Sequence, residues 1–239
     1  MMINRLMVAA VFGLAISLIT MIGLAQQVQP GAAEPKRFDE LVRADFFAGL
    51  GGDAAAMARA MRLIEQTLST NPRHPEALVW HGSALVGQGA LAFEKGDAVT
   101  GANLFERGLQ EMNDAVTLTP DNVGVLIPRG ATLLEVSRSV LDRERATELL
   151  ATGVRDYEKA LALQAPYFRY LSEHSRGELL FGLAEGLHRL GERERARRYF
   201  ERLLSEAKNS TYGTMAAAWL DDPSDASVRR QACVGCHRK

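Results

Sequence analysis

The chain has 239 residues, of which 47% are hydrophobic and 24% are charged, an ordinary composition for a globular protein with one core or one repeat array. Lys and Arg number 28 against 29 Asp and Glu, so the formal net charge is −1. Such a balance provides no overall field for nucleic acid or for an anionic lipid surface, and we predict no nucleic-acid partner.

Residues 1–25 are predicted to be a signal peptide or a membrane anchor. Residues 6–25, LMVAAVFGLAISLITMIGLA, carry no charge, and a helix of that length spans about 30 Å, enough to cross a bilayer. The segment also ends in the small residues that precede a cleavage site. Two alternatives stay open: a retained membrane helix, or a soluble protein after cleavage near Ala25. Both predict a periplasmic or other extracytoplasmic location, because Arg5 keeps the short head inside.

Residues 26–36 are a polar linker, and residues 37–220 are predicted to form an all-α body of repeated helical hairpins. Pro75, Pro120 and Pro166 recur at nearly equal intervals, and at each we expect one helix to end and the next to begin. Each interval contains an internal break, and an earlier, shorter unit has one too: Lys95-Gly96-Asp97, Leu141-Asp142-Arg143, Leu190-Gly191-Glu192 and Gly51-Gly52-Asp53. A fixed period of two helices and two turns predicts a right-handed α-solenoid.

One unit, LLFGLAEGLHRLGERERARRYFERLL (179–204), has a specific spacing of small and apolar residues: Leu180, Leu183, Ala184, Leu187, Gly191, Ala196 and Phe200. This spacing resembles a tetratricopeptide repeat (TPR), and Trp80 and Ala84 resemble the first helix of another. The resemblance implies that small residues let the two helices of a hairpin approach, and that Phe200 fills the gap between neighbouring hairpins. The units are about eleven residues longer than the 34-residue standard.

Two further features of the body carry predictions. Pro128, inside VGVLIPRGATLLEV (123–136), is expected either to kink its helix or to mark where that helix starts. The stretch YGTMAAAWL (212–220) predicts a short helix that caps the array. Asp221-Asp222-Pro223-Ser224 then breaks the chain before a C-terminal segment, residues 221–239.

The two cysteines of the chain lie in that segment, in Cys233-Val234-Gly235-Cys236-His237. C-x-x-C-H is the pattern of c-type haem attachment. Two thiols at this spacing can form thioethers with the vinyl groups on one porphyrin edge, and the adjacent histidine can ligate the iron. We therefore predict one covalent haem c, attached through Cys233 and Cys236, with His237 as the proximal iron ligand.

Three other interpretations of the cysteines stay open. A plain disulfide is permitted outside the cytoplasm. A redox-active C-x-x-C needs a thioredoxin-like strand and helix that the sequence lacks. A zinc site needs a fourth ligand, and there is no second cysteine pair. None of the three explains the histidine that follows at once.

Only Arg238 and Lys239 follow the motif, and in this respect the tail is similar to class II cytochromes c, four-helix bundles with C-x-x-C-H near the C-terminus. The resemblance covers the tail alone, because the body has too many helices. The haem is expected to rest against the last TPR-like unit or another chain, or to stay exposed. Met215 is the nearest candidate for a sixth iron ligand, and an open or water-bound position is an alternative. Further candidates are the histidines at 74, 81, 174 and 188.

The sequence thus favours a periplasmic monohaem c-type cytochrome whose TPR-like scaffold mediates protein–protein interaction and electron transfer to a redox partner protein. The solenoid could also form homo- or hetero-oligomers. No Gly-rich phosphate loop, H-E-x-x-H or nucleophile–base pair indicates an enzyme. The alternatives are a non-haem TPR scaffold or a cytochrome-maturation factor that exchanges thiols, and, third, a haem enzyme such as a peroxidase. Basic residues of the tail could bind haem propionates, attract an acidic partner or keep the segment soluble: Arg229, Arg230, Arg238 and Lys239.

Overall fold

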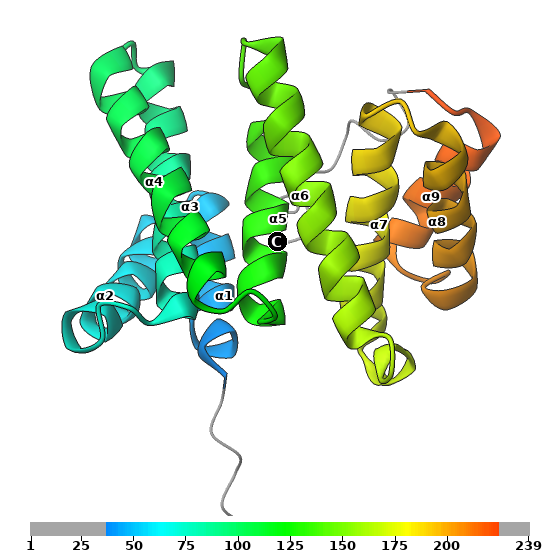
Figure 1. The fold of residues 1–239 in the computed structure, drawn as a ribbon, viewed down its shortest axis with the longest axis horizontal. Coiled ribbons are helices and arrows are strands. Elements are labelled where there is room, and N and C mark those ends of the chain that lie inside the picture. The colour runs from blue at the N-terminus through cyan, green and yellow to red at the C-terminus, as the bar shows by residue number, and fades with distance from the viewer. Residues whose placement is uncertain (1–36, 225–239) are drawn as a thin grey trace, which may run out of the picture. The chain divides into compact units, whose positions relative to one another are not determined.

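The computed structural model describes residues 37–224, so the predicted signal or anchor and the C-x-x-C-H motif lie outside the described residues. Within this range every regular element is a helix (Figure 1), which confirms the all-α prediction for the body. The elements are α1 (Phe38–Leu50), α2 (Ala54–Thr70), α3 (Pro75–Glu94), α4 (Ala98–Leu118), α5 (Val123–Val136), α6 (Arg143–Gln164), the 3₁₀ helix η1 (Phe168–Tyr170), α7 (Glu173–Arg189), α8 (Arg193–Glu206) and α9 (Thr211–Asp221).

The helices pair into consecutive hairpins, α1–α2, α3–α4, α5–α6 and α7–α8, and α9 packs on the last of them. The first helices of successive hairpins also contact one another, α1 with α3, α3 with α5 and α5 with α7 (Figure 1). This stacking of two-helix units confirms the predicted TPR-like solenoid. None of the helices in residues 37–224 has both the length and the apolar composition that a membrane span requires.

Glycines end three of the first helices where the sequence predicts internal breaks. Gly52, Gly96 and Gly191 have φ values of 110°, 81° and 83°, a left-handed region that favours glycine. An aspartate then caps the next helix in two of these turns: Asp53 accepts hydrogen bonds from two backbone N–H groups of α2, and Asp97 accepts one from α4. The chain therefore reverses direction within a few residues, and the two helices of a hairpin become antiparallel neighbours.

The prolines follow the predictions less closely. Pro75 is the first residue of α3 and Pro120 lies in the turn before α5, as expected. After Pro166 the next α-helix does not begin at once, because η1 intervenes and inserts Phe168, which is 4% exposed, into the core. Pro128 lies inside α5 and does not mark its start. The start is set upstream, where the Asn122 side chain accepts the N–H of Gly124 at 2.8 Å.

Two hydrophobic clusters form the core. One contains Phe46, Trp80 and Met112 and draws on α1 to α6; the other contains Phe200 and Trp219 and draws on α5 to α9. Six of the residues that carry the TPR resemblance belong to the second cluster and have no exposed surface: Leu180, Leu183, Ala184, Leu187, Ala196 and Phe200. Phe200 stacks on Trp219 of α9 with ring centroids 4.4 Å apart, so it fills the gap between the last hairpin and α9, whereas the prediction places it between two hairpins.

Candidate functional site

The first helices of the hairpins, α1, α3, α5 and α7, border a groove with a cavity of about 320 Å³. Tyr157 of α6 and Tyr212 of α9 complete its lining. A cavity of this size is at the lower end of those that bind small molecules or cofactors. Because its walls come from hairpins far apart in the sequence, the groove exists only when the solenoid is assembled.

Aromatic rings form two walls of this groove. Trp80 of α3 is 3% exposed and packs edge-to-face against Phe46 and Phe47 of α1, with ring centroids 4.9 and 6.2 Å away. Its indole Nε1 is buried and donates to no acceptor among residues 37–224. At the α7 side the ring centroids of Phe181 and Tyr212 are 5.7 Å apart. The two walls therefore present rigid, apolar ring surfaces.

Small residues keep the floor of the groove open. A Cβ atom added to Gly87 would meet only Leu50 Cδ2, at 3.7 Å. Tyr157 reaches the floor from α6 because the neighbouring positions on α5 and α7 are glycines. A Cβ atom on Gly130 would lie 2.5 Å from the Tyr157 ring, and one on Gly182 would overlap that ring. The floor thus has room above it and an aromatic ring within it.

A buried ion pair lies where α7 meets the end of α5. The Glu185 side chain is 3% exposed, and its Oε1 lies 2.7 Å from Arg138 Nη2 and 3.5 Å from Arg189 Nε. Arg189 also donates to the Leu134 carbonyl and to Ser137 Oγ, both at 2.7 Å. Burial raises the pKa of Glu185, and the two arginines offset this only in part. This network ties α7 to α5 and fixes the spacing of the two walls there.

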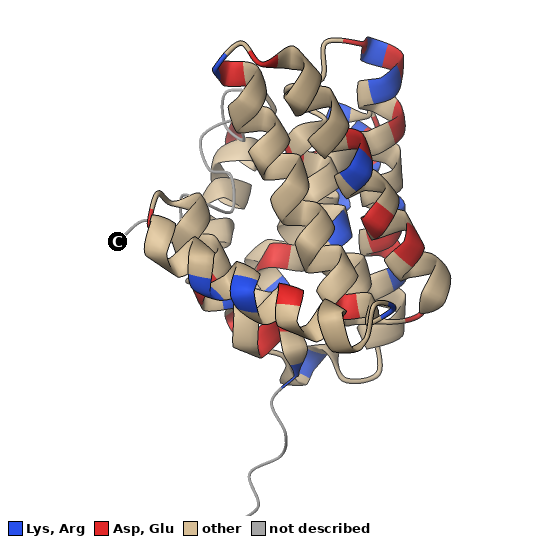
Figure 2. Ribbon diagram, turned by 90° about the vertical axis from the view of Figure 1, so that its left-hand side faces the viewer, with Lys and Arg blue, Asp and Glu red and all other residues tan. Residues whose placement is uncertain are grey.

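The rim of the groove carries both signs of charge. Arg43 of α1 donates to Asp39 at 3.0 Å, and Glu135 of α5 lies 3.4 Å from Arg138 Nε. Glu178 of α7 also lines the groove. The wider surface is mixed as well: Figure 2 shows acidic and basic residues interspersed on the side that it presents. Charge recognition in the groove must therefore come from individual side chains.

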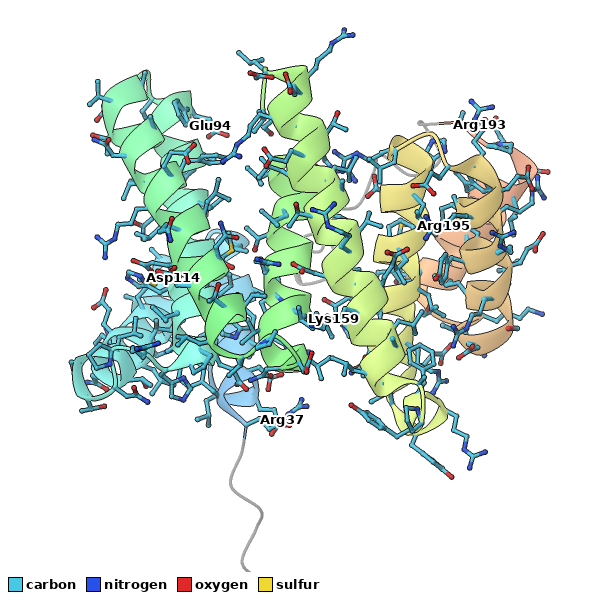
Figure 3. The ribbon with its side chains drawn as sticks, viewed as in Figure 1. Arg37, Glu94, Asp114, Lys159, Arg193 and Arg195 are labelled. Carbon is cyan, nitrogen blue, oxygen red and sulfur yellow. The ribbon has the colours of Figure 1, made fainter. Side chains whose placement is uncertain are left out.

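Exposed ion pairs join the outer helices, opposite the groove. Arg195 of α8 pairs with Glu158 of α6, and Lys159 of α6 lies 2.8 Å from Asp121 in the turn before α5 (Figure 3). Exposed pairs of this kind contribute about 0–1 kcal/mol each. They bridge neighbouring hairpins, and we assign them no role in binding.

Of the residues in the predicted haem site, the candidates for the sixth iron position are the ones that lie within residues 37–224. Cys233, Cys236 and His237 lie outside the described residues. Met215 lies in α9, is 9% exposed and packs in the second core cluster; it does not line the groove. Within residues 37–224, no group of three or more His, Cys, Asp or Glu side chains is placed to hold a metal ion.

The histidine candidates for the sixth iron position are dispersed over the body. His81 and His188 are buried, at 9% and 7% exposure. His74 is the N-cap of α3, and its Nδ1 accepts the N–H of Ala77 at 3.1 Å. His174 is exposed at the start of α7. No two of them share a site, so each remains a separate candidate.

Sequence reasoning did not identify the groove. The signal that could have revealed it is a row of residues along one face of the first helix of each hairpin. This row adjoins the face that packs against the second helix of the same hairpin. On α3 the row consists of Trp80, Ser83, Gly87 and Ala90, spaced three or four residues apart and therefore on one helix face. One large ring, Trp80, is followed along this row by three small residues, which leave space beside the ring.

No protein-family model and no curated protein matches the chain. Among solved structures, the crystal structure of a thermophilic TPR protein from Thermus thermophilus is similar, with 19% sequence identity and a TM-score of 0.46, and the match covers 84% of this chain and 98% of that chain. The fold of this chain therefore rests on its own helices: it is a TPR-like helical scaffold with an apolar groove.

Proposed function

We propose that this protein is an exported helical scaffold that carries one covalent haem c on its C-terminal segment and exchanges electrons with a redox partner protein. The observation that carries this proposal is the sequence Cys233-Val234-Gly235-Cys236-His237. Its donor set fits the group, since two thiols at this spacing can form the thioethers and the imidazole can ligate the iron. The uncharged N-terminal segment supports a periplasmic location, where c-type haem is attached.

The described body supports the same proposal in a second way. Its groove is lined mainly by apolar and aromatic side chains and includes two arginines, Arg43 and Arg138. A haem has a large apolar ring and two carboxylate propionates, so the chemistry of the groove fits it. When bound, haem supplies a one-electron couple, and the thioethers and His237 would hold it to the chain.

Met215 is the candidate sixth ligand nearest to the motif in sequence, and it does not line the groove. Its side chain packs beside Phe200 and Trp219 in the second core cluster, so it would have to leave that cluster to reach an iron. Removing a buried side chain from a packed core costs several kcal/mol. The packing of Met215 therefore favours an open or exchangeable sixth position over Met215 ligation.

The experiment is a pyridine haemochrome spectrum of the full chain, expressed with haem-attachment machinery and then subjected to acid–acetone extraction. We expect a c-type band that survives extraction, because thioethers hold the haem covalently. A Cys233→Ser, Cys236→Ser double variant should lose the band and keep its helical circular dichroism, since both residues lie outside the solenoid. If the wild-type chain shows no band, the cytochrome proposal is wrong.

A second candidate function is a non-haem scaffold that binds a partner protein, and the groove itself favours it, because an apolar groove needs no haem to bind a peptide. In a variant of this function the two cysteines exchange thiols with an apocytochrome. Titration of free thiols before and after reduction distinguishes the candidates: haem thioethers leave no reducible pair, whereas a disulfide yields two thiols.

A further inference from the structure

We propose that the groove is the docking site of the C-terminal tail of the same chain, residues 225–239, with the C-x-x-C-H motif over the apolar floor. This inference deepens the proposed function, on which its haem part rests. Three observations carry it: where the described chain ends, how far the tail reaches, and how its charges match the rim of the groove.

The described chain ends beside one wall of the groove. Trp219, near the end of α9, packs against His188 near the end of α7, with ring centroids 5.4 Å apart. Glu185, about one helical turn before His188 on α7, belongs to the lining of the groove. Figure 1 shows α9 beside α7 and α8 at this end of the solenoid. The tail therefore starts close to the α7 wall.

The tail is long enough to reach every part of the groove. Fully extended, the segment from residue 225 to residue 236 spans about 40 Å. Packed helices lie about 8–10 Å apart, so α7 and α1 are separated by roughly 30 Å at most. The two cysteines can therefore lie over the floor at Gly87 without any change in the solenoid.

The charges of the tail flank the motif on both sides. Arg229 and Arg230 precede it and Arg238 and Lys239 follow it, while Asp225 is the one acidic side chain of residues 225–239. A chain with two basic clusters around a short neutral centre can be anchored at both ends. Each basic cluster needs a carboxylate at the rim that it can reach.

The rim provides such carboxylates. Glu135 on α5 has a side chain that is 54% exposed, and Glu178 on α7 lines the same groove. Glu178 makes no ion pair with any residue in 37–224, so its charge is available to a cation from the tail. Glu185 is occupied by Arg138 and Arg189 and is not needed. Glu135 and Glu178 can therefore pair with the basic clusters of the tail.

The groove also suits the group that the tail is proposed to carry. Arg43 and Arg138 stand at the groove with side chains 35% and 32% exposed, and they pair with Asp39 and Glu185. A guanidinium has five N–H donors, so those left over in each side chain can bind a carboxylate such as a haem propionate. Phe47, Leu50 and Ile127 offer apolar surface beside them. The arginines would hold the propionates of a haem, and the apolar side chains would contact its ring.

The experiment is site-specific photo-crosslinking in the full chain. The photoreactive residue p-benzoylphenylalanine replaces Ala90, which lines the groove and is exposed, or, as a control, Val99 of α4, which is 75% exposed and outside the groove. Mass spectrometry then identifies the linked peptides. We expect an intramolecular link from position 90 to residues 225–239, and none from position 99.

Charge reversal provides a second readout. The Glu135→Lys, Glu178→Lys variant should lower the yield of the link about tenfold, the effect of losing two ion pairs. The matched control, Glu65→Lys, Glu201→Lys, changes two exposed glutamates on the outer helices α2 and α8 and should leave the yield unchanged. High salt should weaken the link in the wild-type chain.

The outcomes separate this inference from the proposed function. Crosslinking is performed on chains with and without attached haem, and the haemochrome spectrum scores the haem independently. A tail link without any haem band supports docking and refutes the cytochrome. A haem band without the link refutes docking and leaves the cytochrome intact. Links from position 90 to the tail of a second copy, or to another protein alone, also overturn the proposal, because the groove would then have a different occupant.

Discussion

The α3–α4 and α7–α8 hairpins bring their helices together in different ways. In α3–α4, with helices of 20 and 21 residues, the backbones touch at a glycine pair: a Cβ atom on Gly82 would lie 2.5 Å from the Gly108 carbonyl oxygen, and one on Gly108 would lie 2.5 Å from the Gly82 oxygen. In α7–α8, Leu187, Ala196 and Phe200 fill the space and have no exposed surface.

The difference determines which substitutions each hairpin tolerates. Side chains in a packed interface can shift or leave a cavity when one of them is shortened. Backbone atoms in contact cannot change rotamer, so they cannot make room for an added atom. We therefore expect α7–α8 to be sensitive to loss of volume and α3–α4 to be sensitive to gain of volume.

The largest effect is expected from Phe200→Ala. The Phe200 ring is fully buried and stacks on Trp219, so its removal opens a cavity between α8 and α9. Such truncations cost about 3–5 kcal/mol, measured as the free energy of unfolding in urea. Arg198→Ala, an exposed neighbour on the same helix, should change it by less than about 0.5 kcal/mol. A loss below about 1 kcal/mol for Phe200→Ala would contradict the assigned packing.

Gly108→Ala should have the next largest effect. Alanine is the better helix former by about 0.5–1 kcal/mol, but its Cβ atom would clash with the Gly82 carbonyl oxygen and approach Val86 Cγ2 at 2.9 Å. Overpacking costs about 1–3 kcal/mol, so we expect net destabilisation in the same urea assay. Stabilisation would mean that α3 and α4 are farther apart than described.

Gly87→Ala should have the opposite sign. Gly87 lies on α3, the helix that contains Gly82, but the added Cβ atom would meet only Leu50 Cδ2 at van der Waals distance. The helix propensity of alanine then dominates and raises the free energy of unfolding by about 0.5–1 kcal/mol. The same substitution therefore distinguishes a contact glycine from an open one within one hairpin.

Much of the solenoid is readable from the sequence because its determinants are local. Gly52 and Gly96 mark turns that need positive φ, Asp53 and Asp97 cap the helices that follow them, and prolines mark where units begin. Pro166 and Pro128 show the limit of this reasoning. The burial of Phe168 accompanies a 3₁₀ turn after Pro166, and this burial depends on residues far away in the sequence. Capping by Asn122 places Pro128 inside a helix; that signal is local, but the prediction at Pro128 does not use it.

The groove is less predictable than the hairpins, because it depends on how successive hairpins stack. Trp80 has the helical spacing of a core residue and is buried, yet it also forms a wall of the groove. The pairing of Arg138 with Glu185 joins two hairpins across a long sequence separation. The C-x-x-C-H motif differs from the groove, because five consecutive residues are enough to predict its chemistry. Its position relative to the body cannot be predicted from those residues, and the crosslinking experiment tests it.

The smallest predicted effect concerns Glu111 of α4, whose contribution to the stability of the α3–α4 hairpin depends on pH. In α3–α4, Glu111 pairs with His81 and accepts a hydrogen bond from Arg107 at 2.9 Å, whereas Leu187, Ala196 and Phe200 of α7–α8 do not titrate. Burial raises the pKa of Glu111, but these two partners outweigh burial and hold the pKa below its ordinary value. A lowered carboxyl pKa stabilises the fold above the unfolded pKa of about 4.5, and this stabilisation is lost as the pH falls through the folded pKa.

Glu111→Gln should therefore lower the free energy of unfolding by less than about 1 kcal/mol near pH 7, because the glutamine oxygen still accepts a hydrogen bond and only the charge is lost. The difference from the wild-type chain should shrink as the pH falls below about 4.5, measured by urea unfolding across that range. Arg107→Gln keeps the contact between His81 and Glu111 and should retain part of this pH dependence. A difference that stays constant or grows in acid would show that the carboxylate of Glu111 is not what joins the two helices at this point, and that the glycine contact holds α3–α4 together without it.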